Sequence, residues 1–207
     1  PGEGKSTTTA NLAIALAETG ARVALVDGDL RLPRVAHYMG IEGGVGLTDV
    51  LIGRVELADA LQKWGRGQLF VLPSGPVPPN PSELLGSAAM DLVLAALTEH
   101  FDYVLIDAPP LLLVTDAAVL SKKTRGVILV AASGKTKKHD LTGAVRSLET
   151  AGGELLGLVV TMLPTRGPDS YGYGAYTYGS THELDGSKKP IGRKKRARSR
   201  KSAPAGR

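Results

Sequence analysis

The first eight residues of the chain have the types and spacing of a phosphate-binding loop. They read Pro-Gly-Glu-Gly-Lys-Ser-Thr-Thr, the second half of the pattern G-x-x-x-x-G-K-[ST]. Glycines let backbone N–H groups turn toward phosphate oxygens, the lysine supplies a positive charge for the β- and γ-phosphates, and the serine hydroxyl can ligate Mg²⁺. A glycine-rich turn without a ligand is the alternative, but a helix pattern follows at once and adds the positive end of its dipole. We therefore predict a nucleotide site with contacts from Gly2, Glu3, Gly4, Lys5, Ser6 and Thr7.

Carboxylates stand at the ends of two predicted strands. Asp27 and Asp29 close the first strand, and Asp107 follows four apolar residues at the end of another. Ligands of open α/β sheets lie beyond the carboxyl ends of the strands, so we expect all three side chains to converge on the phosphates and Mg²⁺. Asp107 in particular has the setting of a Walker B aspartate. The alternative is that these aspartates cap the helices that follow.

Short apolar, β-branched strands alternate with helical patterns along the chain. This alternation predicts a doubly wound α/β fold, with a mainly parallel sheet and helices on both of its faces. Five prolines in residues 73–81 predict a loop. The predicted strands are 22–27, 68–72, 103–107, 126–131 and 155–162. We predict helices in the segment that ends at Gly20, at residues 34–39 and, with breaks, at residues 46–61. Another predicted helix begins at Ser82, and three more span residues 87–101, 115–122 and 137–151.

The loop pattern also bears on domain organisation. Its first glycine, and the strand that leads into such a loop, would precede Pro1, so we expect an N-terminally truncated domain whose missing strand belongs in the middle of the sheet. Residues 1–164 form the predicted domain. The periodic pattern stops there: residues 165–185 are rich in glycine and tyrosine, and residues 186–207 are basic. Because neither segment has an apolar face, we expect both to be disordered.

Composition excludes several classes of protein. The 207 residues contain no cysteine, which excludes disulfide scaffolds, cysteine-zinc sites and thiol catalysis. The four histidines show no metal-ligand spacing. No apolar run reaches the roughly 20 residues that span a bilayer, and no signal peptide opens the chain. We therefore expect the bulk of the chain to be soluble and cytoplasmic.

The net charge of +5 combines two opposite parts of the chain. Residues 186–207 hold ten lysines and arginines and no acid, so the other 185 residues sum to −5. The basic tail is interpreted in three ways: a solvated disordered end, a segment attracted to an anionic membrane surface, or a nucleic-acid contact. Nucleic acid is the least favoured of these, because no aromatic residue is interleaved among the basic residues for base stacking.

Taken together, these segments resemble a known family. The pairing of the phosphate loop with the sequence Asp-x-Asp-x-Arg at residues 27–31 resembles the deviant Walker ATPases, which include the partition and septum-site ATPases. Within that group the chain is most similar to the bacterial tyrosine autokinases of capsular and exopolysaccharide export. The matching segments are residues 1–8, 25–33, 80–85, 104–110 and the tyrosine cluster at 171–178.

The resemblance implies a role for each site residue. Lys5 binds the phosphates of ATP, Ser6 binds Mg²⁺, Asp27 accepts the proton of a tyrosine, and Asp29 and Asp107 position the metal and its waters. The expected phosphoacceptors are the four tyrosines of the tail, and the glycines between them allow an extended conformation. Without a nucleotide site, the same segment would be interpreted as a low-complexity linker. The four tyrosines are Tyr171, Tyr173, Tyr176 and Tyr178.

The resemblance also implies partners and a location. The family phosphorylates its own tail in trans within a ring of subunits and thereby controls polysaccharide chain length and export. It works with a transmembrane chain-length regulator, fused or separate, and with a cognate phosphotyrosine phosphatase, at the cytoplasmic face of the cell membrane. One rival prediction is a partition-type ATPase switch that binds membrane or DNA; another is a non-catalytic scaffold. Thr161 stands where relatives often carry an asparagine that contacts adenine.

Overall fold

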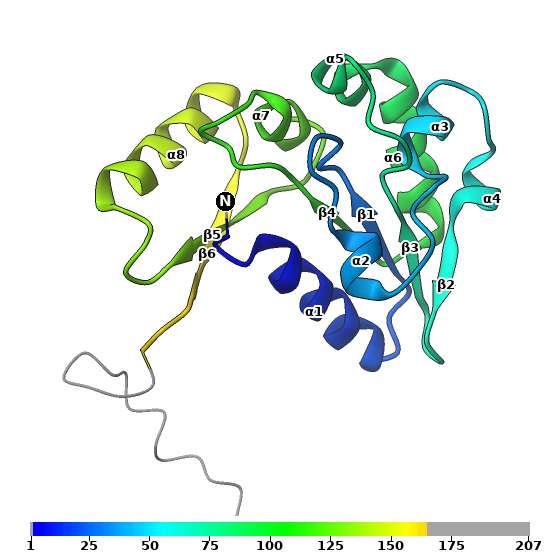
Figure 1. Cartoon of the computed structure of the whole chain (residues 1–207), viewed down its shortest axis with the longest axis horizontal. Coiled ribbons are helices and arrows are strands. Elements are labelled where there is room, and N and C mark those ends of the chain that lie inside the picture. Colours follow the sequence, from blue (N-terminus) through cyan, green and yellow to red (C-terminus); the bar gives the residue numbers. More distant parts are fainter. Residues whose placement is uncertain (1, 165–207) are drawn as a thin grey trace, which may run out of the picture. The chain divides into compact units, whose positions relative to one another are not determined.

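The computed structural model describes residues 2–164 of the chain. The glycine- and tyrosine-rich segment 165–185 and the basic segment 186–207 lie outside the described residues, so the predictions for them stay untested. In chain order the elements are α1 (Lys5–Glu18), β1 (Val23–Asp27), α2 (Val35–Met39), α3 (Leu47–Leu51), α4 (Leu57–Ala60), β2 (Gln62–Trp64), β3 (Leu69–Leu72), α5 (Pro81–Gly86), α6 (Ala88–His100), β4 (Tyr103–Asp107), α7 (Asp116–Ser121), β5 (Val127–Ala132), α8 (Lys138–Ala151) and β6 (Leu155–Thr161) (Figure 1).

The described strands pair in two sheets, ordered β2-β3-β1-β4 and β5-β6. β1 runs parallel to β3 and β4, and β5 runs parallel to β6, while β2 pairs antiparallel with β3. The prediction of a mainly parallel sheet is confirmed. The division between β4 and β5 was not predicted, because an apolar pattern indicates where a strand lies but not which neighbour it pairs with. At the ends of β1 and β4 the register places Asp27 beside Asp107.

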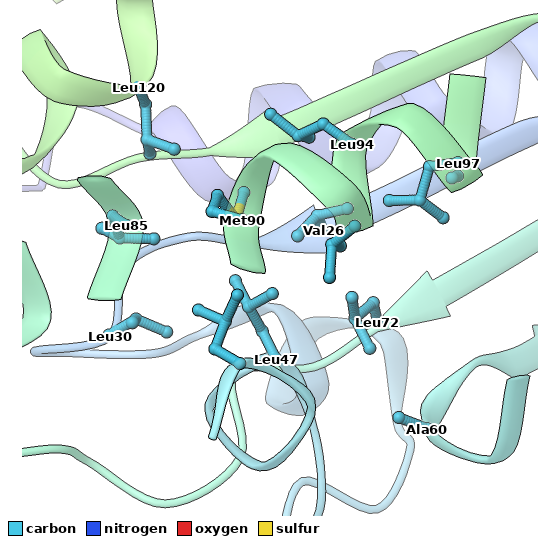
Figure 2. Packing of buried hydrophobic residues seen from close by; sticks show 13 residues of the cluster. Val26, Leu30, Leu47, Ala60, Leu72, Leu85, Met90, Leu94, Leu97 and Leu120 are labelled. Atoms are coloured by element: carbon cyan, nitrogen blue, oxygen red, sulfur yellow. The ribbon is translucent and has the colours of Figure 1, made fainter. Parts of the chain in front are cut away.

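Side chains of β1 alternate between two apolar clusters, one on each face of the larger sheet. All five residues of β1 are buried. Val23 and Leu25 belong to a cluster with three alanines of α1 and with residues of α2. Ala24 and Val26 belong to the other cluster, which also contains Met90, Leu94 and Leu97 of α6 (Figure 2). Burial on both faces explains the continuous apolar sequence of the strand and confirms the doubly wound arrangement.

The predicted helices and strands are all present among residues 2–164, and the structure adds one strand. The segment 46–61 divides into α3 and α4 at the breaks in its pattern. The added strand, β2, is three residues long and begins with two polar residues, so it has no apolar signal. Its pairing with β3 defines it. None of the helices among the described residues is long and apolar enough to cross a membrane.

Candidate functional site

The predicted phosphate loop leads directly into α1. Gly2 and Gly4 have φ angles of 84° and 87°, in the left-handed region that glycine adopts without strain. The helix then begins at Lys5, and the amide of Thr8 donates to the carbonyl of Gly4 at 2.8 Å. Among the residues that the structure describes, no side chain caps this end of the 14-residue helix, and its first turn holds no acidic residue. The N-terminal turn is therefore suited to an anion, as the sequence predicts.

Thr161 at the end of β6 supports this loop. Its hydroxyl donates to the carbonyl oxygen of Glu3 at 2.6 Å, across 158 residues of sequence. A Cβ at Gly4 would lie 3.7 Å from the Thr161 methyl group. The side chain thus lies against the backbone of the phosphate loop. Sequence reasoning noted Thr161 only as the residue that stands where relatives often carry an adenine-contacting asparagine, and no local signal indicates this hydrogen bond.

Asp107 lies at the end of β4 and faces the loop. It is buried, and its Oδ1 lies 3.5 Å from the Thr9 hydroxyl. Burial raises the pKa of Asp107, against the opposing effects of a hydrogen bond from Ser6 and the charge of Lys5. Its Oδ2 is buried and has no hydrogen-bond partner among the described residues. An unpartnered carboxylate oxygen beside a serine hydroxyl and a lysine is a suitable ligand for Mg²⁺.

Thr9 is a site residue that sequence reasoning missed. It follows Lys5 by four positions on α1, so both side chains lie on the same face of the helix. Its hydroxyl donates to the Lys5 carbonyl at 3.0 Å and lies near Asp107. That helical spacing is the signal by which Thr9 could have been found.

Asp27 is completely buried at the end of β1. Its Oδ2 accepts from the amides of Arg34 at 3.1 Å and Val35 at 2.9 Å, and its Oδ1 accepts from the amide of Asp29 at 3.2 Å. The pKa of Asp27 is raised to about 7, mainly by burial and also by the nearby charge of Asp107, while these backbone hydrogen bonds act in the opposite direction. The carboxylate therefore caps the start of α2, which is the alternative that the sequence left open, and it also lies beside Asp107.

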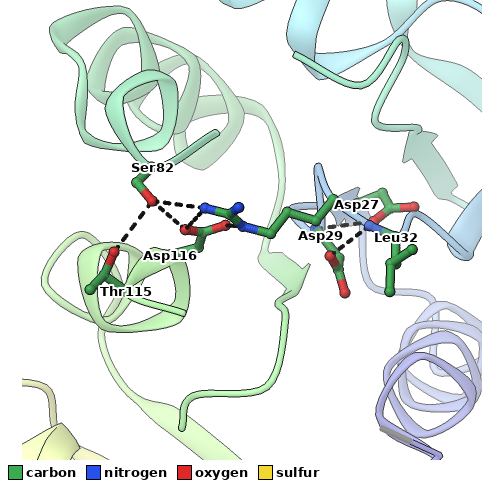
Figure 3. Close-up of polar contacts among 7 residues, drawn as sticks. Asp27, Asp29, Leu32, Ser82, Thr115 and Asp116 are labelled. Atoms are coloured by element: carbon green, nitrogen blue, oxygen red, sulfur yellow. Dashed lines mark hydrogen bonds and ion pairs between the residues drawn. The ribbon is translucent and has the colours of Figure 1, made fainter. Parts of the chain in front are cut away.

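The loop after β1 holds Asp29 close to the same edge of the sheet. The Gly28 amide donates to the Asp107 carbonyl at 2.8 Å, and a Cβ at Gly28 would lie 2.9 Å from that oxygen, so only glycine allows this approach. Asp29 is 7% exposed, and its Oδ1 accepts from the amide of Leu32 at 3.1 Å. Arg31, in the same loop, pairs with Asp116 of α7 (Figure 3). Of the four predicted catalytic residues, Asp27 and Asp107 end β1 and β4, and Asp29 lies in the loop after β1. Lys5 begins α1 directly after the phosphate loop.

Within residues 2–164 there is no group of three or more His, Cys, Asp or Glu side chains arranged to hold a metal. Mg²⁺ typically takes few protein ligands and completes its shell with water and substrate phosphates. The four predicted phosphoacceptors, Tyr171, Tyr173, Tyr176 and Tyr178, lie outside the described residues. Of the tyrosines that the structure describes, Tyr38 and Tyr103 are about half exposed.

This combination of phosphate loop, parallel strands and strand-end aspartates defines a P-loop NTPase, and comparison with known proteins agrees. The model of the ParA family, described as NUBPL iron-transfer P-loop NTPase, matches residues 1–183. Among solved structures, the septum site-determining protein MinD of Pyrococcus horikoshii OT3, complexed with Mg-ADP, is 30% identical with a TM-score of 0.63, over 77% of this chain and 65% of that chain.

Closer similarity lies with protein kinases. Tyrosine-protein kinase YwqD of Bacillus subtilis (strain 168) is 42% identical over 173 residues, which are 84% of this chain and 73% of that protein. The kinase domain of Escherichia coli tyrosine kinase ETK is 33% identical with a TM-score of 0.78, over 87% of this chain and 69% of that chain. The chain belongs to this family of bacterial tyrosine-protein kinases and is an enzyme of that class.

Proposed function

We propose that this kinase transfers the γ-phosphoryl group of ATP to the tyrosines of its own tail. One observation carries the proposal: the phosphate loop, the strand-end carboxylates and the Thr9 hydroxyl meet at one edge of the sheet. The chain also carries a tyrosine cluster at residues 171–178, which a nucleotide switch does not need. The proposed acceptors are Tyr171, Tyr173, Tyr176 and Tyr178.

The residues of the site suit the separate parts of this reaction. Lys5 and the amides of the loop bind the β- and γ-phosphates. Ser6, Asp29 and Asp107 would hold Mg²⁺, and the unpartnered Oδ2 of Asp107 fits that role. When bound, Mg²⁺ offsets the negative charge of the phosphoryl group in transfer. Asp27 is the proposed acceptor of the tyrosine proton, because a carboxyl with a pKa of about 7 is poised to take up a proton near neutral pH.

Phosphate mapping tests the proposal directly. The full chain is incubated with Mg·ATP, and phosphate is located by intact mass and peptide sequencing. We expect phosphotyrosine in residues 171–178, and Lys5→Met should abolish it because the point charge on the phosphates is lost. Changing the four tail tyrosines to phenylalanine should remove most of the label, whereas changing the exposed Tyr38 to phenylalanine is the matched control and should not. Label retained in Lys5→Met would contradict the assignment of Lys5.

A partition-type ATPase switch is the second candidate, favoured by the structural similarity to the septum site-determining protein. Such a switch hydrolyses ATP without forming phosphotyrosine. The same incubation, with released phosphate measured alongside the label, separates the two functions. Hydrolysis with no label on tyrosine would favour the switch, and neither hydrolysis nor label would favour a scaffold.

The resemblance to the autokinases extends this proposal to a cellular setting. We infer that the kinase works at the cytoplasmic face of the cell membrane, in a ring of subunits, with a transmembrane chain-length regulator and a phosphotyrosine phosphatase, and that it controls polysaccharide chain length and export. The ten basic residues of 186–207 support contact with anionic lipid, since each is worth about 1 kcal/mol near such a surface. Flotation with vesicles of anionic lipid, against neutral vesicles as control, tests the membrane contact.

A further inference from the structure

Arg31 joins the loop that carries Asp29 to two helices that lie far away in the sequence. Its Nε donates to Asp116 Oδ2 at 2.8 Å, and its Nη2 donates to Asp116 Oδ1 at 3.1 Å. The same Nη2 lies 3.3 Å from the Ser82 hydroxyl of α5, which itself donates to Asp116. Figure 3 shows the Ser82 hydroxyl beside both Asp116 and Thr115, with which it forms hydrogen bonds. One side chain therefore connects the loop after β1 with both α5 and α7.

The pair differs from an ordinary surface ion pair in its burial. The Asp116 side chain is completely buried, whereas the Arg31 side chain is 41% exposed. Burial alone would raise the pKa of Asp116, but the hydrogen bonds from Arg31 and Ser82 hold that pKa below its ordinary value. A planar, bidentate contact with a fully buried carboxylate favours a single position of the arginine. The backbone around Arg31 is held with it.

That backbone also positions Asp29. The loop is attached to β4 at Gly28, through its hydrogen bond to the Asp107 carbonyl, and to α7 at Arg31. Asp29 lies between these two attachments, and its carboxylate accepts from the amide of Leu32, directly after Arg31. Displacement of Arg31 would therefore displace the donor that orients the Asp29 carboxylate. The guanidinium donates to Asp116 and Ser82, and the pKa of Arg31 is raised by its hydrogen bond to Asp116 and also by the nearby charge of Asp29, so Arg31 acts on the site through the loop and through this charge.

We propose that Arg31 is a positioning residue of this kinase: its ion pair with Asp116 holds the Asp29 loop in the geometry that binds Mg²⁺ with the nucleotide. The inference rests on the proposed function only in its choice of Asp29 as a metal ligand. Groups that orient metal ligands typically contribute about 10- to 100-fold to metal affinity or activity. We therefore expect the affinity for Mg²⁺ to fall about 10-fold or more when the Arg31–Asp116 ion pair is removed.

The test compares Arg31→Met with Arg54→Met in the full chain. Arg54 is the matched control, because it also pairs with a buried aspartate, Asp49, on α3. Two readouts do not require kinase activity: the Mg²⁺ concentration that half-saturates binding of a fluorescent ADP analogue, and hydrogen exchange of the Leu32 amide in the metal-free chain. Arg31→Met should raise the Mg²⁺ requirement about 10-fold and speed Leu32 exchange, and Arg54→Met should change neither. Equal values in the two variants would overturn the proposal.

A double variant separates positioning from stability. Arg31→Met leaves Asp116 as a buried charge without its cation, which destabilises the fold. Adding Asp116→Asn removes that charge, so Arg31→Met/Asp116→Asn should regain thermal stability yet keep the raised Mg²⁺ requirement. Arg31→Lys, which keeps the charge but loses the bidentate contact, should fall between wild type and Arg31→Met. If the double variant binds Mg²⁺ and nucleotide as the wild type does, Arg31 serves stability alone.

The results that would contradict the proposed kinase function differ from those that would contradict the positioning role of Arg31. A wild-type chain that forms no phosphotyrosine but binds Mg·ADP would contradict the kinase proposal, while the comparison of Arg31→Met with Arg54→Met would still decide the positioning role. A wild-type chain whose nucleotide binding does not depend on Mg²⁺ would overturn the positioning role itself.

Discussion

The buried carboxyl of Asp27 should make the stability of the metal-free chain fall as the pH rises through neutrality. Burial raises the pKa of Asp27 from the ordinary value of 3.8 to about 7. Between these two values the folded state binds a proton that the unfolded state does not, so raising the pH removes a stabilising contribution. The gap corresponds to about 4 kcal/mol, of which about 3 kcal/mol should be lost between pH 5 and pH 8.

The variant Asp27→Asn isolates this contribution. An asparagine cannot ionise, so the variant should lack most of the slope, whatever its absolute stability. The assay is urea unfolding of both proteins at pH 5, 6, 7 and 8 with a chelator present. Because both proteins carry the same histidines, the difference between their slopes reports the Asp27 region.

Two results would refute this reasoning. Parallel stability curves for the wild type and Asp27→Asn would mean that Asp27 is ionised in the folded state throughout the range. A wild-type stability that rises from pH 5 to pH 8 relative to the variant would give the wrong sign. Either result would also remove the basis for Asp27 as a proton acceptor with a pKa of about 7.

Three further predictions concern packing and the phosphate loop. Gly46→Ala should destabilise the fold strongly, because a Cβ there would lie 2.0 Å from a backbone carbonyl oxygen, whereas Gly44→Ala meets nothing within 4 Å and should shift the urea midpoint little. On α6, Leu97→Ala should cost about 2–5 kcal/mol of unfolding free energy, and Leu92→Ala, at a position 73% exposed, less than about 0.5 kcal/mol. Thr161→Val should weaken nucleotide binding about 5-fold through loss of the 2.6 Å bond to the loop, and Thr161→Ser should retain it. Unchanged binding by Thr161→Val would show that the loop holds its shape without this bond.

The local elements and the position of the site follow from short-range patterns. The spacing of Lys5 and Ser6 after two glycines predicts the loop, because a phosphate cradle is built from consecutive residues. The strand-end positions of Asp27, Asp29 and Asp107 predict their convergence, because parallel strands end at one edge of a sheet. Both predictions needed only neighbouring residues and one general rule of sheet architecture.

Contacts between distant segments were beyond the reach of these patterns. Arg31 and Asp116 are 85 residues apart, and their pairing depends on how α7 packs against the loop after β1. The Thr161 hydroxyl donates to the Glu3 carbonyl because β6 ends beside the phosphate loop. In the same way, the fully buried position of Asp27 arises from the layers around β1. The sequence alone determined which residues have the chemistry to handle a nucleotide, while the packing of the helices against the sheet decided how those residues are oriented, supported and charged.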